Sequence, residues 1–332
     1  GDGSPKKIID GIIHNLKSNK QNFFLIFGNK NEIEPYINDK IAKEFYKIIH
    51  TENMVKSTDS PLEAAKRGKD TSMWLAIESV KKRDCDIVIS AGNTGALLVI
   101  SKLNLKMIEN IDKPALSALW PNKNGMNVVL DLGANIECNE KNLVDFSLMG
   151  SALHKSLFEN EDPKVALLNI GSEEIKGTEL LKGTYTKLKK LDEMGDFKFY
   201  GYIEGNHITD GKCNVIVTDG FTGNVALKTA EGTANFLTDN LKQALSNNIF
   251  SKFSSALSYF ALRKFKNKLD PRKYNGAIFL GLKGPVVKSH GSTDALGFSY
   301  SLDVCYKIAK GEMINKIKLN LGHIKSINNE QK

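Results

Sequence analysis

Short runs of β-branched and aromatic residues alternate along the chain with longer segments whose apolar residues recur at helical spacing. The isoleucines after Pro5 predict a helix that runs to Lys20, residues 23–27 (FFLIF) predict a buried strand, and residues 32–46 hold another helical pattern. Because neither a methionine nor a strand precedes the turn-like first residues, we expect the native chain to begin earlier.

The same alternation continues through the rest of the chain. Ser60 with Glu63 three residues later is typical of a helix N-terminus, and a basic loop at 66–73 leads into a helix to about Lys82. Further strands are expected at 84–90, 127–130, 165–170, 197–203 and 214–217, and further helices at 96–103 and 139–154. Apolar strands separated by helix-length segments predict an α/β fold with a mainly parallel sheet.

Residues 214–232 (NVIVTDGFTGNVALKTAEG) combine a predicted strand, a glycine-containing loop and a helix start. The first N–H groups of a helix have no partner inside the helix, and the helix dipole adds positive charge there, so phosphate or an oxyanion binds well. Gly220 and Gly223 would allow close approach of the backbone. The alternative is an ordinary turn in which Asn224 only caps the helix, and this stretch alone does not distinguish the two.

Polar residues follow several of the predicted strands. In a parallel sheet the loops at the carboxyl ends of the strands lie at one edge, and α/β proteins bind their ligands there. We expect that edge to collect Asn93, Thr94, Asn135, Lys176, Thr222 and Asn224.

The composition indicates a folded protein with a basic C-terminal part. With 332 residues, 41% of them hydrophobic, the chain can form a large core in one or two domains, and no apolar run approaches the roughly 18 residues that span a bilayer. Residues 241–332 contain 16 Lys and Arg against 5 Asp and Glu. This distribution argues against nucleic-acid binding along the whole protein and favours a local patch for an acidic partner or an anionic membrane.

Common motifs of nucleotide-binding and hydrolytic enzymes are missing. The sequence contains no GxGxxG after a strand, no GxxxxGKS/T, no HExxH and no GxSxG. The histidines lack ligand spacing, and Asp131 and Asp219 lie in different loops without an obvious third carboxylate. We therefore expect neither a metal nor another cofactor, and we interpret the four widely spaced cysteines as reduced packing residues of a cytosolic protein.

Five motifs occur in order along the chain: SAGNTGALL (90–98), LDLGAN (130–135), LNIGSEEIKGTEL (168–180), DGFTGNVALKTAEG (219–232) and KSHGSTDA (288–295). Together they resemble the bacterial acyl-acyl carrier protein:phosphate acyltransferases of phospholipid synthesis. The resemblance implies an α/β/α fold like that of the isocitrate and isopropylmalate dehydrogenases and of phosphate acetyltransferase. It also implies one catalytic domain over residues 1–332, with a helical arm at 240–275 inside it.

The same resemblance implies the reaction and its residues. The family transfers a long acyl chain from the thioester of acyl carrier protein to inorganic phosphate, giving acyl phosphate. Lys176 and Asn224 stand where the family's proposed catalytic lysine and asparagine stand. The matching motifs place the expected substrate-binding residues at Asn93, Thr94, Gly95, Gly133, Asn135, Gly177, Thr222, Gly223 and His290.

The expected partners follow from the same family. They are acyl carrier protein, inorganic phosphate, a second copy of the chain, an anionic membrane and the downstream membrane acyltransferase, with no nucleic acid. The protein is therefore expected in the cytoplasm, peripherally associated with the cytoplasmic membrane.

The chemistry of this reaction suits the two candidate catalytic residues. Phosphate that attacks a thioester forms an oxyanion from a nucleophile that is already charged, so the site must stabilise negative charge. Lys176 can supply a compact positive charge, and the Asn224 amide can donate to the thioester carbonyl oxygen. The alternatives are a surface lysine on a polar loop and a helix cap.

Residues 246–275 are expected to form a basic amphipathic segment. Seven Lys and Arg and a single Asp surround an apolar helical stripe there, which suits contact with an anionic lipid surface. The expected membrane contacts are Phe253, Leu257 and Phe260. The alternative is an arm that buries these side chains against the core or a second subunit.

Two rival functions account for parts of the sequence. The first is a related enzyme of the same fold, either a phosphate acetyltransferase or a metal- and NAD-dependent decarboxylating dehydrogenase. It lacks support, because the sequence contains neither a dinucleotide motif nor an aspartate cluster. A non-catalytic membrane or nucleic-acid adaptor would use the basic C-terminal part, but it would leave the glycine loops unexplained.

Overall fold

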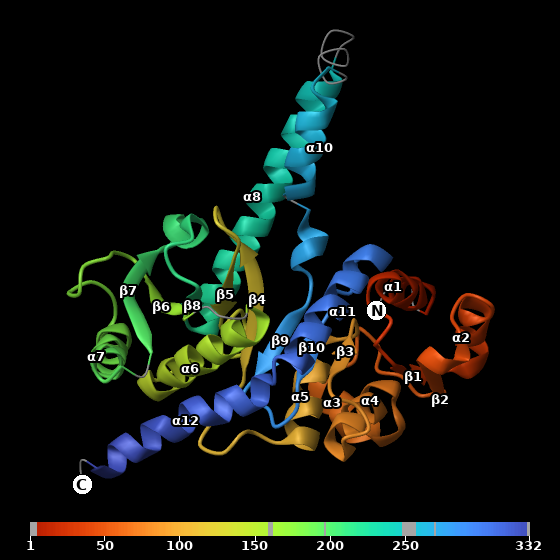
Figure 1. The fold of residues 1–332 in the computed structure, drawn as a ribbon, viewed down its shortest axis with the longest axis horizontal. Helices are drawn as coiled ribbons and strands as arrows, with labels where there is room; N and C mark the ends of the chain where they lie inside the picture. Colours follow the sequence, from red (N-terminus) through yellow and green to blue (C-terminus); the bar gives the residue numbers. More distant parts are fainter. Residues whose placement is uncertain (1–4, 159–161, 196, 248–256, 269, 331–332) are drawn as a thin grey trace.

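The computed structural model of the chain describes residues 5–158, 162–195, 197–247, 257–268 and 270–330. Its centre is an eight-stranded mixed sheet with helices on both faces, which gives the predicted α/β/α layers (Figure 1). The strands lie in the order β3 (Val88–Ser90), β10 (Val286–Lys288), β9 (Ala277–Leu280), β4 (Ala115–Pro121), β5 (Met126–Leu130), β8 (Val215–Val217), β6 (Lys164–Asn169) and β7 (Lys198–Glu204).

Strand direction divides this sheet into two parallel parts. β5, β8, β6 and β7 are parallel to one another, and β3 is parallel to β10. Between the two parts, β9 and β4 run antiparallel to each other and to their outer neighbours. The mainly parallel α/β sheet is confirmed, but β4, β9 and β10 were not predicted, and they reverse the direction of β3 relative to β5.

The helices form mostly where the apolar pattern predicts them. They are α1 (Lys6–Ser18), α2 (Lys30–Ile37), α3 (Pro61–Arg67), α4 (Ser72–Lys82), α5 (Thr94–Leu105), α6 (Glu140–Leu157), α7 (Glu179–Glu193), α8 (Gly220–Ser246), α10 (Tyr259–Lys268), α11 (Ala295–Lys310) and α12 (Met313–Glu330). Ser60 caps α3 as predicted, since its hydroxyl accepts a hydrogen bond from the N–H of Glu63. All four cysteines are free.

A second sheet of two parallel strands lies beside the N-terminal helices. It pairs β1 (Phe24–Gly28) with β2 (Tyr46–His50). The predicted helix over 32–46 is therefore too long, because it ends at Ile37 and Tyr46 begins a strand. The apolar residues of β2 pack in one core with β1, α1 and α2, and this tertiary contact outweighs the local helical pattern.

Helices cover the two faces of the main sheet unequally. α6, α7 and α11 cover one face, whereas α3, α4 and α5 cover only the β3–β10–β9 part of the other. On that other face, the buried residues of β5, β8 and β6 pack against the loop that follows β7, through Ile208 and Cys213. This loop therefore covers a part of the sheet face that no helix of the α3–α5 group covers.

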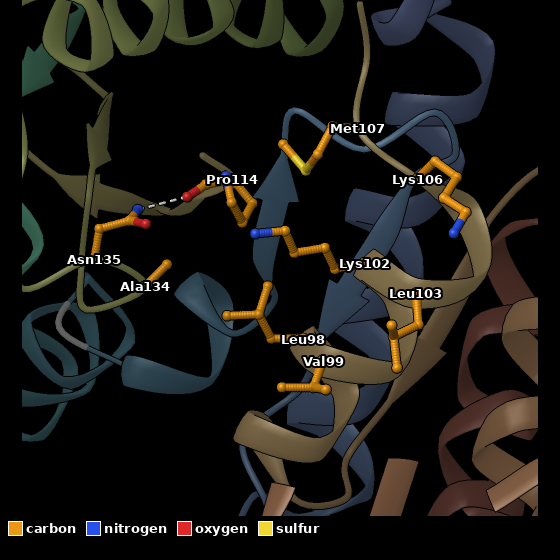
Figure 2. Close-up of a pocket in the computed structure, with 9 residues that line it drawn as sticks. All are labelled: Leu98, Val99, Lys102, Leu103, Lys106, Met107, Pro114, Ala134 and Asn135. Atoms are coloured by element: carbon orange, nitrogen blue, oxygen red, sulfur yellow. Dashed lines mark hydrogen bonds between the residues drawn. The ribbon is translucent and has the colours of Figure 1, made fainter. Parts of the chain in front are cut away.

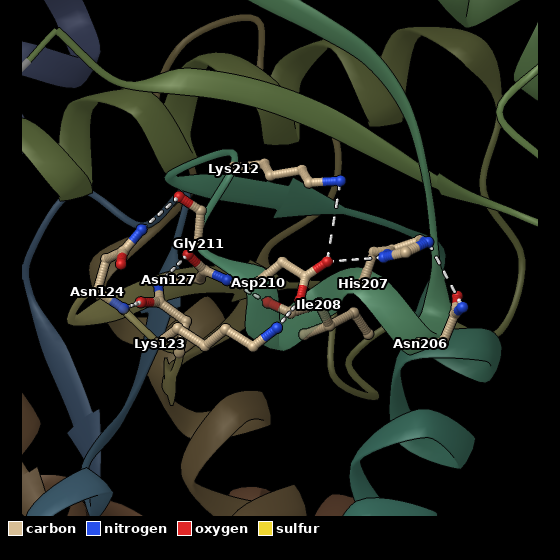
Figure 3. A network of polar contacts seen from close by, with 10 residues as sticks. Lys123, Asn124, Asn127, Asn206, His207, Ile208, Asp210, Gly211 and Lys212 are labelled. Carbon is tan, nitrogen blue, oxygen red and sulfur yellow. Dashed lines mark hydrogen bonds and ion pairs between the residues drawn. The ribbon is translucent and has the colours of Figure 1, made fainter.

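A polar network fixes that loop to the β4–β5 hairpin (Figure 3). The Asp210 carboxylate pairs with Lys123 at 2.7 Å and with the His207 Nδ1 atom at 2.7 Å. The fully buried Asn127 donates from Nδ2 to the Ile208 carbonyl oxygen at 2.5 Å. These partners lower the pKa of Asp210 to about 2, chiefly through the Lys123 hydrogen bond.

Two helices project from the body of the protein as an arm. α8 and α10 lie side by side there and extend away from the sheet (Figure 1). Along α8, only Gly220 and Gly223 at its start are buried. The arm therefore exposes almost the whole length of α8.

Candidate active site

Three adjacent parallel strands end side by side and carry the predicted catalytic motifs. Leu130, the last residue of β5, pairs with Val217 of β8, which in turn pairs with Leu167 of β6. The loop 131–135, the start of α8 and the loop 170–178 follow these strands. The chain thereby brings the segments of Asn135, Lys176 and Asn224 to the same edge of the sheet, as predicted for parallel strands.

Buried Asp131 organises the loop 131–135. It has no solvent exposure, and one carboxylate oxygen accepts hydrogen bonds from the N–H groups of Leu116 (3.0 Å), Gly133 (3.1 Å) and Ala134 (2.9 Å). The other oxygen accepts from both the backbone N–H and the side-chain amide of Asn135, each at 2.8 Å. Burial raises the pKa of Asp131, and these hydrogen bonds oppose the shift.

Asp131 was not predicted as a site residue, although the Asp-Leu-Gly-Ala-Asn pattern is typical of a carboxylate that accepts hydrogen bonds from the following backbone N–H groups. Asn135 was predicted to bind substrate. Its amide nitrogen instead donates to Asp131 and, at 2.6 Å, to the Pro114 carbonyl oxygen. In this structure Asn135 fixes the loop, and its substrate contact stays a prediction.

The first turn of α8 packs directly against the loop 131–135. A Cβ atom on Gly223 would overlap the backbone oxygen of Asp131, and one on Gly220 would overlap the backbone of Asn135. A Cβ atom on Gly133, which has a φ of +124°, would lie 3.4 Å from the Asn224 Cβ. The loop and the Asn224 side chain are therefore neighbours.

Asn224 is not the cap of α8, which corrects one alternative for this residue. The helix begins at Gly220, and the Asp219 side chain caps it by accepting from the N–H of Thr222 at 2.9 Å. The Thr222 hydroxyl also donates to Asp219, at 2.8 Å. Asn224 lies one turn further along, exposed and free of any capping bond.

The glycine-containing loop expected before the helix is itself helical at residues 221–224, and fewer N–H groups than expected are free at the start of α8. The N–H of Gly220 donates to the Asn135 carbonyl oxygen at 2.8 Å, and that of Thr222 donates to Asp219. A carboxylate already occupies the positive end of the helix dipole. This arrangement weakens the helix terminus as an anion site and gives more weight to side chains nearby.

Lys176 lies exposed on the loop between β6 and α7. Buried Asn169 positions this loop, because its Nδ2 donates to the Lys176 carbonyl oxygen at 3.1 Å and its Oδ1 accepts from the Ile170 N–H at 2.8 Å. Gly177 packs against the Asn169 amide with a φ of +92°, which only glycine adopts readily. Lys176 forms no side-chain hydrogen bond or ion pair with the residues that the structure describes, so its ammonium group is available to an anion.

The remaining predicted binding residues follow the other parallel part of the sheet. Asn93 caps α5 by accepting from the N–H of Ala96 at 3.0 Å, and its amide donates to the carbonyl oxygens of Ser57 and Asp59. His290 is exposed, and its Nδ1 lies 2.8 Å from the Ser292 hydroxyl. The predicted binding residues in this part of the sheet are Asn93, Thr94, Gly95 and His290.

Because β3 and β10 run opposite to β5, β8 and β6, the sheet does not bring the carboxyl ends of the two parts to one edge. The expectation that a single edge collects Asn93 and Thr94 with Asn135, Lys176 and Asn224 is therefore wrong. The unpredicted antiparallel strands β4 and β9 are the physical reason. The substrate contacts of Asn93, Thr94, Gly95 and His290 stay predictions.

Two features of the described residues bear on metals and membranes. No three His, Cys, Asp or Glu side chains are grouped there in a way that could hold a metal ion. Among the helices of the same residues, none is both long and apolar enough to pass through a membrane.

Two solved enzymes share the fold of this chain. A phosphotransacetylase from Streptococcus pyogenes matches with a TM-score of 0.62 at 16% identity, covering 95% of this chain and 92% of that chain. A branched-chain phosphotransacylase from Enterococcus faecalis V583 matches with a TM-score of 0.54 at 16% identity, covering 92% and 96%. At this identity the likeness establishes the fold alone.

Sequence relatives are much closer. A family model described as fatty acid synthesis protein matches residues 1–316. A phosphate acyltransferase of Pelagibacter ubique is 66% identical over 321 residues, which cover 97% of this chain and 96% of the relative. One of Maricaulis maris is 41% identical over 336 residues, which cover 100% and 95%. The chain therefore belongs to the phosphate acyltransferase family.

Proposed function

We propose that this enzyme transfers a long-chain acyl group from acyl-acyl carrier protein to inorganic phosphate and so makes acyl phosphate for membrane phospholipid synthesis. The observation that supports the proposal is the shared edge of β5, β8 and β6, to which the loop of Lys176, the exposed Asn224 and the loop 131–135 all belong. We expect residues 1–332 to act as one catalytic domain, in which the predicted basic amphipathic segment 240–275 includes the end of α8 and all of α10.

The reaction needs a cation for phosphate and a donor for the oxyanion. An oxygen of phosphate, held by Lys176, forms a bond to the thioester carbonyl carbon, and the negative charge moves to the carbonyl oxygen. The Asn224 amide donates to that oxygen. The intermediate then collapses: the C–S bond breaks, acyl phosphate forms, and the carrier's thiolate leaves and takes a proton from solvent.

The test is a carrier-protein assay with labelled phosphate. Wild type should form labelled acyl phosphate from acyl-acyl carrier protein, and Lys176→Ala should form it roughly 100-fold more slowly or worse, the scale for one preorganised donor. Circular dichroism should show the variant folded. Wild-type turnover by a folded Lys176→Ala would exclude this residue as the phosphate ligand.

A related phosphotransacetylase activity is the less favoured alternative. The solved structures with that title share the fold at 16% identity, whereas the relatives at 66% and 41% identity are phosphate acyltransferases. Replacing the acyl carrier protein with acetyl-coenzyme A in the same assay separates the two activities. Faster turnover of acetyl-coenzyme A would favour the alternative.

A homodimer would cover an apolar surface around the candidate site. Large side chains lie exposed on the three site segments and further along α8: Ile136 (77% exposed), Ile170 (81%), Ile175 (81%), Phe221 (62%), Val225 (51%), Phe236 (67%) and Leu237 (60%). Several large apolar side chains exposed near one site are typical of an interface between subunits. Sedimentation of Val225→Glu should show a monomer, whereas Lys242→Glu on the same helix should leave the dimer intact.

The arm is proposed as the peripheral membrane contact. Phe253 lies outside the described residues, but Leu257 and Phe260 are 74% and 81% exposed, so neither packs on the core of its own chain. Leu257→Glu/Phe260→Glu should lose co-sedimentation with anionic vesicles, while Leu319→Glu, a similarly exposed site on α12, should not. If the double variant instead loses the dimer, these side chains belong to a subunit contact.

This contact would explain how an amphiphilic product reaches its consumer. Acyl phosphate combines an alkyl chain with an anionic head and partitions into bilayers. The enzyme would work in the cytoplasm, take its acyl chain from acyl carrier protein, and deliver the product to a downstream membrane acyltransferase without any nucleic-acid partner.

A further inference from the structure

A mostly apolar cavity of about 500 Å³ lies between α5 and the loop 131–135 (Figure 2). One wall is formed by residues of α5 and the segment that follows it, and the other by Pro114 and the loop. The lining residues are Leu98, Val99, Lys102, Leu103, Lys106, Met107, Pro114, Ala134 and Asn135. The volume is within the range of small-molecule sites.

The cavity and the candidate catalytic residues share one loop. Ala134 and Asn135 line the cavity, and Gly133 next to them faces the Asn224 side chain. A carbonyl group held at Asn224 would therefore place its substituent beside the Gly133–Ala134 backbone, which forms the border of the cavity. The buried Asp131 carboxylate fixes this border through its hydrogen bonds.

The lining matches an alkyl chain better than a polar arm. Six of its side chains are apolar, and the Asn135 amide nitrogen is already bonded to Pro114 and Asp131. A pantetheine arm, which carries two amides, would find few free partners for them, and burying unpaired amides is costly. A polymethylene chain needs only apolar contact.

Lys102 does not prevent this occupancy. Figure 2 shows its side chain extending across the cavity toward Pro114. It is exposed, and it forms no ion pair or side-chain hydrogen bond within the described part of the chain, so it can change rotamer on a fast timescale. Its aliphatic stem then adds apolar surface while the ammonium group stays in water.

We propose that this cavity binds the alkyl chain of the acyl substrate and sets the preferred chain length. The inference rests on the proposed acyl transfer, and it assigns a specificity role to Val99 and Leu98. Both residues lie on α5, across the cavity from the loop 131–135, so their replacement should change the choice of substrate and not the chemistry.

The test fills the cavity with a larger side chain. Val99→Trp should lower kcat/KM for long-chain acyl-acyl carrier proteins roughly 60-fold, if about three methylenes lose contacts worth roughly fourfold each, and leave short-chain substrates unchanged. Leu62→Trp, at an exposed position of α3, is the matched control and should keep the wild-type chain-length profile. Unchanged discrimination by a folded Val99→Trp would overturn the proposal.

Two further outcomes separate this inference from the function it rests on. An equal loss at every chain length would mean that the cavity holds the pantetheine arm, which also overturns the proposal. Calorimetry with unreactive alkyl phosphates needs no turnover: wild type should bind long chains more tightly than short ones, and Val99→Trp should lose that difference. If wild type makes no acyl phosphate yet shows this binding pattern, the proposed function fails and the chain-binding cavity stands.

Discussion

Gly223 and Asp131 meet backbone to backbone, with no room for a methyl group between the helix and the carbonyl oxygen of the loop. This contact sets the distance between Asn224 and the loop that borders the cavity. It also couples two segments that are far apart in the sequence, since Gly223 lies on α8 and Asp131 directly follows β5.

Gly223→Ala should therefore displace the start of α8. We expect acyl phosphate formation to fall by about 100-fold and the free energy of unfolding to fall by about 1–3 kcal/mol, the usual range for an overpacked buried site. Gly232→Ala is the control, because nothing lies within 4 Å of its added methyl group on the same helix. That change should stabilise the helix by about 0.5–1 kcal/mol and keep activity.

Asn224→Asp should show whether Asn224 acts in catalysis or in capping the helix. Because Asp219 caps α8, the free energy of unfolding of the variant should be within about 0.5 kcal/mol of the wild-type value. Its turnover should fall about 100-fold, because the donor is lost and a negative charge faces the phosphate. Asp219→Ala should lower stability by about 1 kcal/mol. Full activity in a stable Asn224→Asp would remove this residue from the mechanism.

Asn169→Ala should act through the position of Lys176. The loss of its hydrogen bond to the Lys176 carbonyl oxygen should raise the KM for phosphate about tenfold and leave the KM for acyl-acyl carrier protein unchanged. Asn127→Ala is a matched control: it too removes a buried asparagine, but one that bonds the Ile208 carbonyl oxygen in the loop after β7. Both should lose about 1–3 kcal/mol of stability, and only Asn169→Ala should change KM.

His154 should make the fold sensitive to acid. It is 1% exposed on α6, and burial lowers its pKa to about 4. Below about pH 6.5 His154 takes up a proton in the unfolded chain, but in the folded protein it does so only near pH 4. The free energy of unfolding therefore falls by roughly 3 kcal/mol as the pH drops through this window. No such loss from this group occurs above pH 6.5.

The measurement is urea unfolding of wild type and His154→Leu between pH 7 and pH 4. Asp145, whose pKa burial raises to about 6, titrates in the same window with the opposite sign, but it is present in both proteins and cancels in the comparison. The two stability curves should diverge as the pH falls. Parallel curves would show that His154 titrates alike in the folded and unfolded states.

Local pattern was sufficient to predict the parallel strands β5, β6, β7 and β8, because each is a short apolar run followed by a glycine or polar loop. β4 and β9 were missed for a physical reason. Leu116 pairs with Phe279, and no local signal records a partner so distant in the chain. The direction of β3 depends on those two strands, which is why Asn93 was expected at the wrong edge.

The helix cap shows the same limit at a finer scale. Both Asp219 and Asn224 are good capping residues, and glycines stand beside each. What decides between them is tertiary: Gly220 and Gly223 are the residues that fit against the loop 131–135, so the helix must include both. Asp131 was likewise recognisable only as a turn residue, because its burial depends on the surrounding sheet.

The length of α8 has a consequence for how product leaves the enzyme. Its 27 residues span about 40 Å, with Asn224 near the end that packs on the sheet and the other end far out along the projecting arm (Figure 1). An arm that contacts lipid at its far end would hold the reacting carbonyl well outside the bilayer. The membrane contact would then keep the enzyme beside the bilayer, and acyl phosphate would cover the last few nanometres along the protein surface or through water.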